Sequence, residues 1–176
     1  MQCIYTNLKV LLRSTSDTKG FFMYRVLFAD DESNIRRGIK CLLDWESMGF
    51  STDYEAENGQ EALDIIKKYQ PDLILLDIRM PKLHGTEVIK AAREAGFTGK
   101  CIILSGYSDF TYAQTAIRYN VDFYLTKPID EDDLWKDVEK AVSKIVSTKF
   151  FLIDNAEVTG CKKAFFRTVE EKAILA

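Results

Sequence analysis

Short apolar runs and helical stripes alternate along the chain from about residue 25 onward. Apolar runs bounded by polar residues are typical of buried parallel strands, and apolar residues spaced three and four apart predict helices. The predicted strands cover residues 25–29, 51–56, 72–76, 100–104 and 121–125. The predicted helices cover residues 33–43, 59–69, 85–95, 109–119 and 131–147. Five strand–helix units imply an α/β fold, a doubly wound parallel sheet with helices on both faces.

Helix-start signals support these assignments. Asn58 is expected to cap the helix at 59–69, with Glu61 at the capping-box position. Asp109 and Asp130 are expected to cap the last two helices. The last helix is expected to bury one apolar stripe, made of Leu134, Val138, Ala141, Val142 and Ile145.

Polar side chains stand where predicted strands end: Asp30 and Asp31, then Asp77, then Ser105, then Lys127. Ligands of open α/β sheets gather at the carboxyl ends of the strands, so these five side chains are expected to converge. Three carboxylates, a hydroxyl and an ammonium suit a divalent cation together with a phosphoryl group. Each residue alone has a simpler explanation as a helix cap, a turn residue or a solvated cation. Their joint occurrence on successive strand ends favours one shared site.

Composition and charge narrow the class of protein. The chain has 47% apolar and 29% charged residues and a mean hydropathy of −0.15, which is typical of a globular protein in water. It contains no apolar stretch of membrane-spanning length, and a signal peptide is not expected, so a cytoplasmic location without membrane partners is expected. Residues 23–148 hold 16 basic and 22 acidic residues, a net charge of −6. This region therefore lacks the basic footprint of a nucleic-acid-binding domain.

Cysteine and histidine usage argues against a zinc site. The four cysteines are far apart and form no CxxC pair, and His84 is the only histidine. Cys101 falls in a predicted core strand and Cys41 on the apolar face of a predicted helix. Both are expected to be buried free thiols.

Residues 24–147, about 70% of the chain, resemble the receiver domain of bacterial two-component response regulators. The matching stretches are Val26–Glu32, Glu57–Leu63, Pro71–Pro81 with Gly85, Leu104–Phe110 and Asp122–Pro128. The resemblance implies a flavodoxin-like (βα)5 receiver fold with a five-stranded parallel sheet in the order 2-1-3-4-5. It also implies a phosphoprotein that acts in phosphorelay signal transduction and in transcription regulation.

The resemblance also implies a phosphorylation site. Asp77 would be the phosphoacceptor, whose carboxylate attacks the phosphorus of a phosphohistidine on a sensor histidine kinase. Mg²⁺ would be held by Asp31, Asp77 and the backbone carbonyl of Arg79, while Asp30 would act mainly through water. No cofactor other than Mg²⁺ is implied, and no enzymatic turnover beyond self-phosphorylation and self-dephosphorylation.

Three further side chains have roles implied by the resemblance. Lys127 would add a fixed positive charge beside the phosphoryl oxygens, and Ser105 would donate a hydrogen bond to the acyl phosphate. Tyr124 would be the switch aromatic, although it could also simply pack on the neighbouring helices. The surface expected to change on phosphorylation, and to support a homodimer, consists of helix 109–119, strand 121–125 and helix 131–147.

One segment narrows the subfamily. Asp44-Trp45-Glu46, followed by Gly49-Phe50, looks like receivers that are fused to AraC-type helix-turn-helix output domains. Such an output needs on the order of 100 further residues, whereas 28 follow residue 148. DNA is therefore expected as a partner only where an output domain is present in the full-length protein.

The expected organisation has three parts. Residues 1–22 are expected to be a non-conforming N-terminal extension that reflects a misassigned start, because the receiver pattern begins at Met23, a natural initiator. The codons of Lys19-Gly20 form a purine-rich run that resembles a ribosome-binding site. The alternative is a real, loosely ordered extension. Residues 23–148 form the receiver domain. Residues 149–176 form a short tail without a complete output domain.

Two other functions use similar residues. One is a phosphatase or phosphotransferase that forms an aspartyl-phosphate intermediate, as haloacid-dehalogenase-like enzymes do. Those enzymes carry a second Asp two residues after the nucleophile, and here that position is Arg79. The other is a non-phosphorylated pseudo-receiver that only mediates protein contacts, and the complete acidic set together with Lys127 argues against it.

Overall fold

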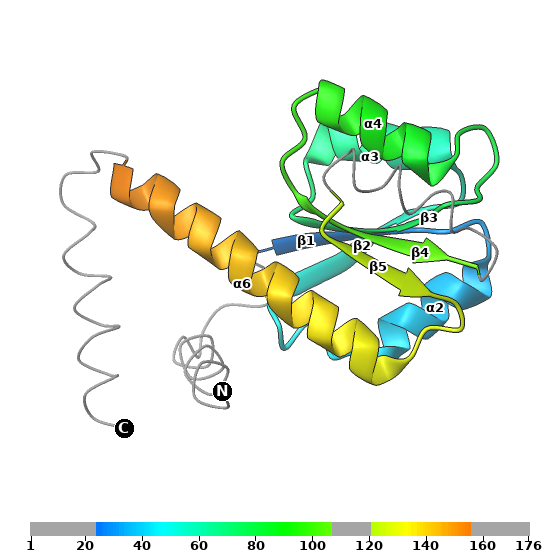
Figure 1. Cartoon of the computed structure of the whole chain (residues 1–176), viewed down its shortest axis with the longest axis horizontal. Helices are drawn as coiled ribbons and strands as arrows, with labels where there is room; N and C mark the ends of the chain where they lie inside the picture. The colour runs from blue at the N-terminus through cyan, green and yellow to red at the C-terminus, as the bar shows by residue number, and fades with distance from the viewer. Residues whose placement is uncertain (1–23, 107–120, 156–176) are drawn as a thin grey trace. The chain divides into compact units, whose positions relative to one another are not determined.

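The computed structural model describes residues 24–106 and 121–155 (Figure 1). Its strands are β1 (Tyr24–Ala29), β2 (Phe50–Ala56), β3 (Leu73–Asp77), β4 (Lys100–Ser105) and β5 (Phe123–Thr126). Its helices are α2 (Ser33–Leu42), α3 (Gly59–Tyr69), α4 (Gly85–Glu94) and α6 (Glu131–Asn155). The strands are all parallel and lie in the order β2-β1-β3-β4-β5, as predicted. The helix predicted at 109–119, and with it Asp109, lies outside the described residues.

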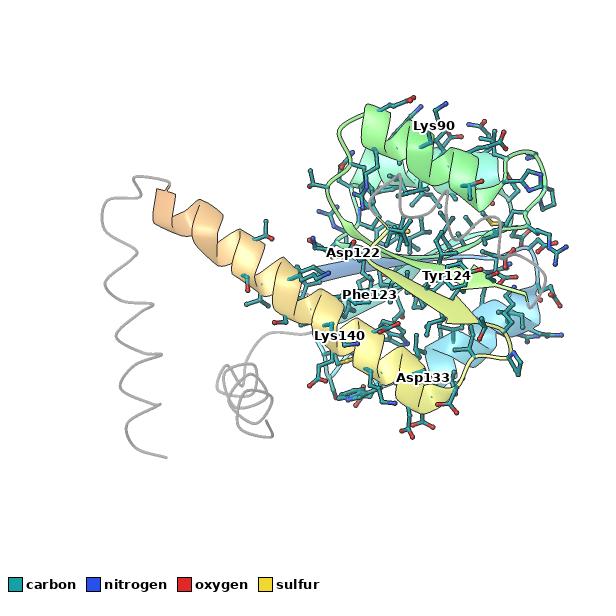
Figure 2. The ribbon with its side chains drawn as sticks, viewed as in Figure 1. Lys90, Asp122, Phe123, Tyr124, Asp133 and Lys140 are labelled. Carbon is teal, nitrogen blue, oxygen red and sulfur yellow. The ribbon has the colours of Figure 1, made fainter. Side chains whose placement is uncertain are left out.

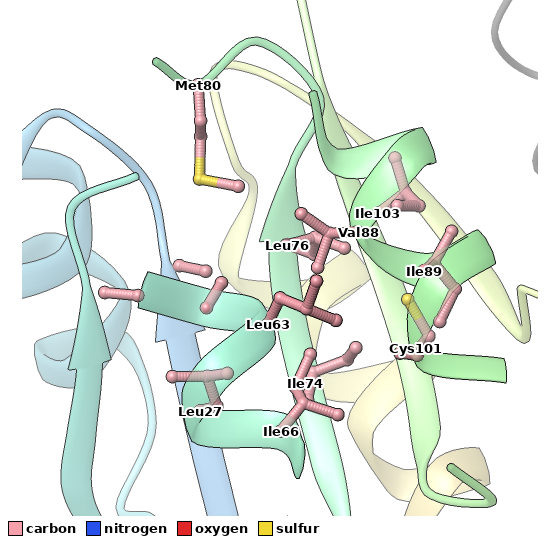
Figure 3. Close-up of a cluster of buried hydrophobic side chains, with 14 of the residues drawn as sticks. Leu27, Leu63, Ile66, Ile74, Leu76, Met80, Val88, Ile89, Cys101 and Ile103 are labelled. Atoms are coloured by element: carbon pink, nitrogen blue, oxygen red, sulfur yellow. The ribbon is translucent and has the colours of Figure 1, made fainter. Parts of the chain in front are cut away.

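The four helices within residues 24–106 and 121–155 lie on both faces of the sheet. Helices α3 and α4 lie on one face, and α2 and α6 lie on the other (Figure 1). Side chains alternate along each strand, so both faces of this sheet receive apolar residues. Figure 3 shows the core beneath α3 and α4, where Leu27, Ile74 and Ile103 from three strands meet Ile66 and Val88. All five side chains are fully buried.

The opposite face is closed partly by the segment between α2 and β2. Trp45 is buried there, and its ring meets Phe28 edge-on at a centroid distance of 5.1 Å and Phe50 at 5.9 Å. The indole N–H donates to the Ile39 carbonyl at 3.1 Å, so burying this polar group leaves no unmade hydrogen bond. The five residues predicted to form the buried stripe of the last helix are buried as well.

Two of the predicted helix caps are confirmed. The Asn58 side chain accepts a hydrogen bond from the Glu61 N–H at 3.0 Å, and the Glu61 carboxylate accepts from the Glu57 N–H at 2.9 Å. The Asp130 carboxylate accepts from the N–H groups of Asp132 and Asp133.

Two element boundaries differ from the prediction by two residues or more. Strand β5 begins at Phe123 rather than 121, because Asp122 lies just before it and binds Cys101 through both its backbone N–H and its carboxylate. Helix α6 continues to Asn155 rather than ending at 147, since the sequence holds no Gly or Pro there to stop it.

The predicted burial is confirmed for Cys101 and is wrong for Cys41. Cys101 is buried on β4, and burial raises the pKa of its thiol. Cys41 is exposed. The buried positions of α2 are Arg36 and Ile39, and Cys41, two residues past Ile39, lies on the other side of the helix.

None of the helices within the described ranges is long and apolar enough to cross a membrane.

Close approach of α4 to the end of β3 depends on Gly85. A methyl group at this position would lie 2.2 Å from the Asp77 carbonyl oxygen and 3.2 Å from the Cα of Ile78. The Gly85 N–H donates to the Ile78 carbonyl at 2.8 Å, which holds the loop against the strand end. The backbone that presents Asp77 is therefore packed directly on the start of α4.

Gly85→Ala is expected to lower the free energy of unfolding by about 1–3 kcal/mol, because the added methyl group overpacks the end of β3. Gly38→Ala is the matched control, since nothing lies within 4 Å of a methyl group at that position in α2. It should raise the free energy of unfolding by about 0.5–1 kcal/mol through helix propensity. Urea denaturation measures both, and equal stability of the two variants would contradict the close approach.

Candidate functional site

Three of the predicted site residues meet at the carboxyl ends of the strands. The Lys127 Nζ lies 2.7 Å from Oδ2 of Asp30 and 2.7 Å from Oδ1 of Asp77. Asp30 follows β1 and Asp77 ends β3, and these strands are neighbours in register, with Ala29 opposite Leu76. Lys127 follows β5, at the edge of the sheet, and its long side chain reaches across the end of β4.

Both carboxylates are almost out of solvent. Asp30 is 1% exposed and Asp77 5%. The Arg79 N–H donates to Oδ2 of Asp77 at 2.7 Å, and the Glu32 N–H donates to Oδ1 of Asp30 at 2.9 Å. Each carboxylate therefore has one oxygen bound to backbone and the other directed at Lys127.

Asp31 is the second carboxylate of this turn and was predicted to hold the metal. It is exposed, and its carboxylate makes no hydrogen bond or ion pair with any residue in 24–106 or 121–155. It belongs to the same turn as Asp30, so only its backbone ties it to the site.

Ser105 and Tyr124 form a second contact beside the first. Ser105 ends β4 and is fully buried, and Tyr124 lies on β5, the neighbouring strand (Figure 2). The Tyr124 hydroxyl donates to the Ser105 Oγ at 2.5 Å, and the Ser105 hydroxyl donates to the Gly106 carbonyl at 3.0 Å. The Lys127 N–H donates to the Ser105 carbonyl at 2.7 Å, which joins this pair to the lysine.

The charges at the site shift two pKa values. Burial and the charge on Asp30 raise the pKa of Asp77, and burial is the larger of the two causes. Lys127 and the Arg79 N–H lower this pKa, but the net effect is a rise. Burial alone would lower the pKa of Lys127, but the carboxylates of Asp30 and Asp77 more than offset this and raise it. The lysine is therefore a permanent cation at neutral pH.

The donor chemistry of the site fits Mg²⁺. Oδ2 of Asp30, which is buried, has the Lys127 ammonium as its only partner within the described residues. Two carboxylates with one ammonium leave a local excess of negative charge, and carboxylate and carbonyl oxygens are the ligands that Mg²⁺ prefers. No three His, Cys, Asp or Glu side chains in the described part of the chain already form a metal-binding group. Asp31, which follows Asp30 directly, would supply a further carboxylate to the ion.

Sequence reasoning missed one residue that contacts this site. Arg36 of α2 is 5% exposed, and its Nη1 donates to the Asp30 carbonyl at 2.7 Å. Its Nε and Nη2 donate to Glu55 at 2.8 Å and to Glu57 at 3.1 Å. The available signal was a basic residue three positions before Ile39, on the side of the helix that faces the sheet.

The fold and this arrangement are shared with a known family. The sequence profile of the response regulator receiver domain matches residues 26–139. That match covers more than half of the chain, which therefore belongs to the receiver domain family of response regulators.

Individual relatives agree with this assignment. The transcriptional regulatory protein HptR of Staphylococcus aureus is 40% identical over 112 residues, which are 64% of this chain and 44% of that protein. The uncharacterized transcriptional regulatory protein YesN of Bacillus subtilis is 37% identical over 123 residues, 70% of this chain and 33% of that protein. The chain thus spans less than half the length of either relative.

Solved receiver structures superpose on the chain. The receiver domain of AraT, a response regulator from Geobacillus stearothermophilus, is 39% identical and superposes with a TM-score of 0.68. The match covers 72% of this chain and 98% of the AraT chain. A two-component transcriptional regulator AraC from Clostridium phytofermentans has a TM-score of 0.66 and 28% identity, with coverage of 72% and 98%. These names agree with the subfamily expected from the sequence.

The Arg36 network gives stability a definite pH dependence. Burial alone would raise the pKa of Glu55, but hydrogen bonds from Lys40 and Arg36 outweigh it and lower that pKa. Because the folded-state pKa is depressed, the contribution of Glu55 to stability is present above its ordinary pKa and is lost as pH falls through the folded value.

Glu55→Gln should therefore flatten the decline of unfolding free energy between about pH 6 and pH 3, measured by urea denaturation at each pH. Glu94→Gln, at an exposed residue of α4, serves as the control and should keep the wild-type slope. A Glu55→Gln slope equal to that of wild type would contradict the assigned role.

Proposed function

We propose that this chain is a phosphorylation-controlled switch, in which Asp77 accepts a phosphoryl group from a phosphohistidine of a sensor histidine kinase. The observation that carries the proposal is the Lys127 ammonium held between Asp30 and Asp77 at 2.7 Å from each. In the transfer, an oxygen of Asp77 forms a bond to phosphorus while the phosphorus–nitrogen bond breaks and the imidazole leaves. Lys127 supplies a fixed positive charge beside the oxygens of the transferring group.

The site would operate with Mg²⁺. Asp31, Asp77 and the backbone carbonyl of Arg79 would hold the ion directly, and Asp30 would do so through water. The ion would screen the repulsion between carboxylate and phosphoryl oxygens. Asp30 has a second task, since its charge keeps Lys127 protonated and oriented toward Asp77.

Ser105 and Tyr124 would convert phosphorylation into a change of surface. The Ser105 hydroxyl would donate to the acyl phosphate on Asp77, and Tyr124 would follow it inward through their hydrogen bond. The surface that changes would include β5 and α6, together with residues 109–119, which lie outside the described residues. A homodimer through this surface is part of the proposal.

The output would be transcription regulation. Relatives of this chain carry the names of transcriptional regulators and are more than twice as long as the matched region. DNA contacts would then belong to an output domain of a full-length protein, and the receiver would control that domain.

Asp77→Asn should abolish labelling by a small phosphodonor such as acetyl phosphate in the presence of Mg²⁺, because the amide cannot act as the nucleophile. Mass spectrometry of the intact protein measures the added phosphoryl group. Asp64→Asn, at an exposed residue of α3, is the control and should label like wild type. Full labelling of Asp77→Asn would place the acceptor elsewhere and overturn the assignment.

Phosphorylation should change hydrogen exchange along β5 and the adjoining part of α6, because Ser105 leaves its present contacts. In Ser105→Ala, labelling should persist while this change in exchange is reduced or lost, since the hydroxyl that senses the phosphate is gone. Lys127→Ala should keep Mg²⁺ binding and likewise lose the change. Exchange that altered only outside these elements would refute the proposed switching path.

A further inference from the structure

The orientation of Asp31 depends on its backbone, because its carboxylate has no partner among the described residues. The peptide group that joins Asp30 to Asp31 is planar, so a contact that holds the Asp30 carbonyl oxygen also holds the nitrogen of Asp31. Arg36 makes that contact, with Nη1 donating to the carbonyl oxygen at 2.7 Å. The direction in which the Asp31 side chain leaves the turn is therefore tied to Arg36.

Arg36 is itself held from two other sides. Its Nε donates to Glu55 at 2.8 Å and its Nη2 to Glu57 at 3.1 Å, at the end of β2 and just beyond it. Lys40 fixes Glu55 in turn, with Nζ 2.6 Å from the second carboxylate oxygen. A guanidinium is rigid and planar, so three simultaneous contacts leave it little freedom to move.

We propose that Arg36 is a positioning residue for the Mg²⁺ site, which acts by fixing the peptide group that carries Asp31. This inference rests on the proposed function, because it concerns the same metal site. A simpler account is that Arg36 only neutralises Glu55 and Glu57 and stabilises the fold, since buried charges require partners.

The two accounts predict opposite effects on Mg²⁺ affinity. If Arg36 acted only through its charge, removing that cation and leaving two carboxylates unneutralised would strengthen Mg²⁺ binding. If Arg36 positions Asp31, removing it should weaken Mg²⁺ binding in spite of the more negative surroundings. Residues that orient metal ligands typically change affinity by about 10–100-fold when they are mutated.

The experiment measures the Mg²⁺ dissociation constant of the unphosphorylated full chain by isothermal titration calorimetry, without phosphodonor. Arg36→Gln should raise this constant by about 10-fold or more. Arg36→Lys keeps the positive charge but loses the planar guanidinium, so it should give an intermediate dissociation constant. If Arg36→Gln does not fold, the Arg36→Lys variant alone distinguishes the two accounts. Labelling by acetyl phosphate should recover at high Mg²⁺ concentration.

Arg93→Gln is the matched control. Arg93 lies at the opposite end of the sheet, where its Nη1 donates to the carbonyls of Phe97 and Gly99 at 2.8 Å each. This variant should lose stability as Arg36→Gln does but keep the wild-type Mg²⁺ affinity. The inference is overturned if the Arg36 variants bind Mg²⁺ as tightly as wild type or more tightly, or if Arg93→Gln weakens binding equally. Failure of the wild-type chain to bind Mg²⁺ would instead refute the proposed function on which the inference rests.

Discussion

The ammonium of Lys127 lies between the carboxylates of Asp30 and Asp77, and the arrangement of the site depends on this contact. Two buried carboxylates at neighbouring strand ends repel each other, and each carries a desolvation cost of several kcal/mol unless a cation compensates it. The strand order provides that compensation, because it puts β1 beside β3 and brings Lys127 to the same edge of the sheet from β5. The remaining charge imbalance suits a divalent cation such as the Mg²⁺ proposed for this site.

The surrounding structure holds the two carboxylates from opposite sides. Gly85 lets the start of α4 press on the backbone of Asp77, while Arg36 reaches from α2 to the backbone of Asp30. Both contacts are made to main-chain carbonyl groups. They therefore fix the backbone positions of Asp30 and Asp77 and leave the carboxylate oxygens free of these contacts. A site that must receive a metal ion and a phosphoryl group needs its oxygens available and its backbone rigid.

Most of the fold and the centre of the site were predictable from sequence, because strand ends in a parallel sheet converge by geometry. Asp30, Asp77 and Lys127 are in contact for that reason. Arg36 was not predictable, since a basic residue on a helix is usually solvated and turns inward here only because Glu55 and Glu57, about twenty residues away, meet it. Asp31 was expected at the metal; it is exposed, and its place next to Asp30 in the sequence is what puts it near the site.

The Ser105 hydroxyl has one proton to donate. That proton is now donated to the Gly106 carbonyl, while the oxygen accepts from Tyr124. Donation to an acyl phosphate would therefore require the contact with Gly106 to break. A neutral hydrogen bond contributes about 1 kcal/mol net and one to a charged group about 1.5–3 kcal/mol, so the exchange favours the phosphate by about 1 kcal/mol. This bias shifts a two-state equilibrium by roughly fivefold. A complete switch would therefore need further contacts from the ammonium of Lys127 and from the metal.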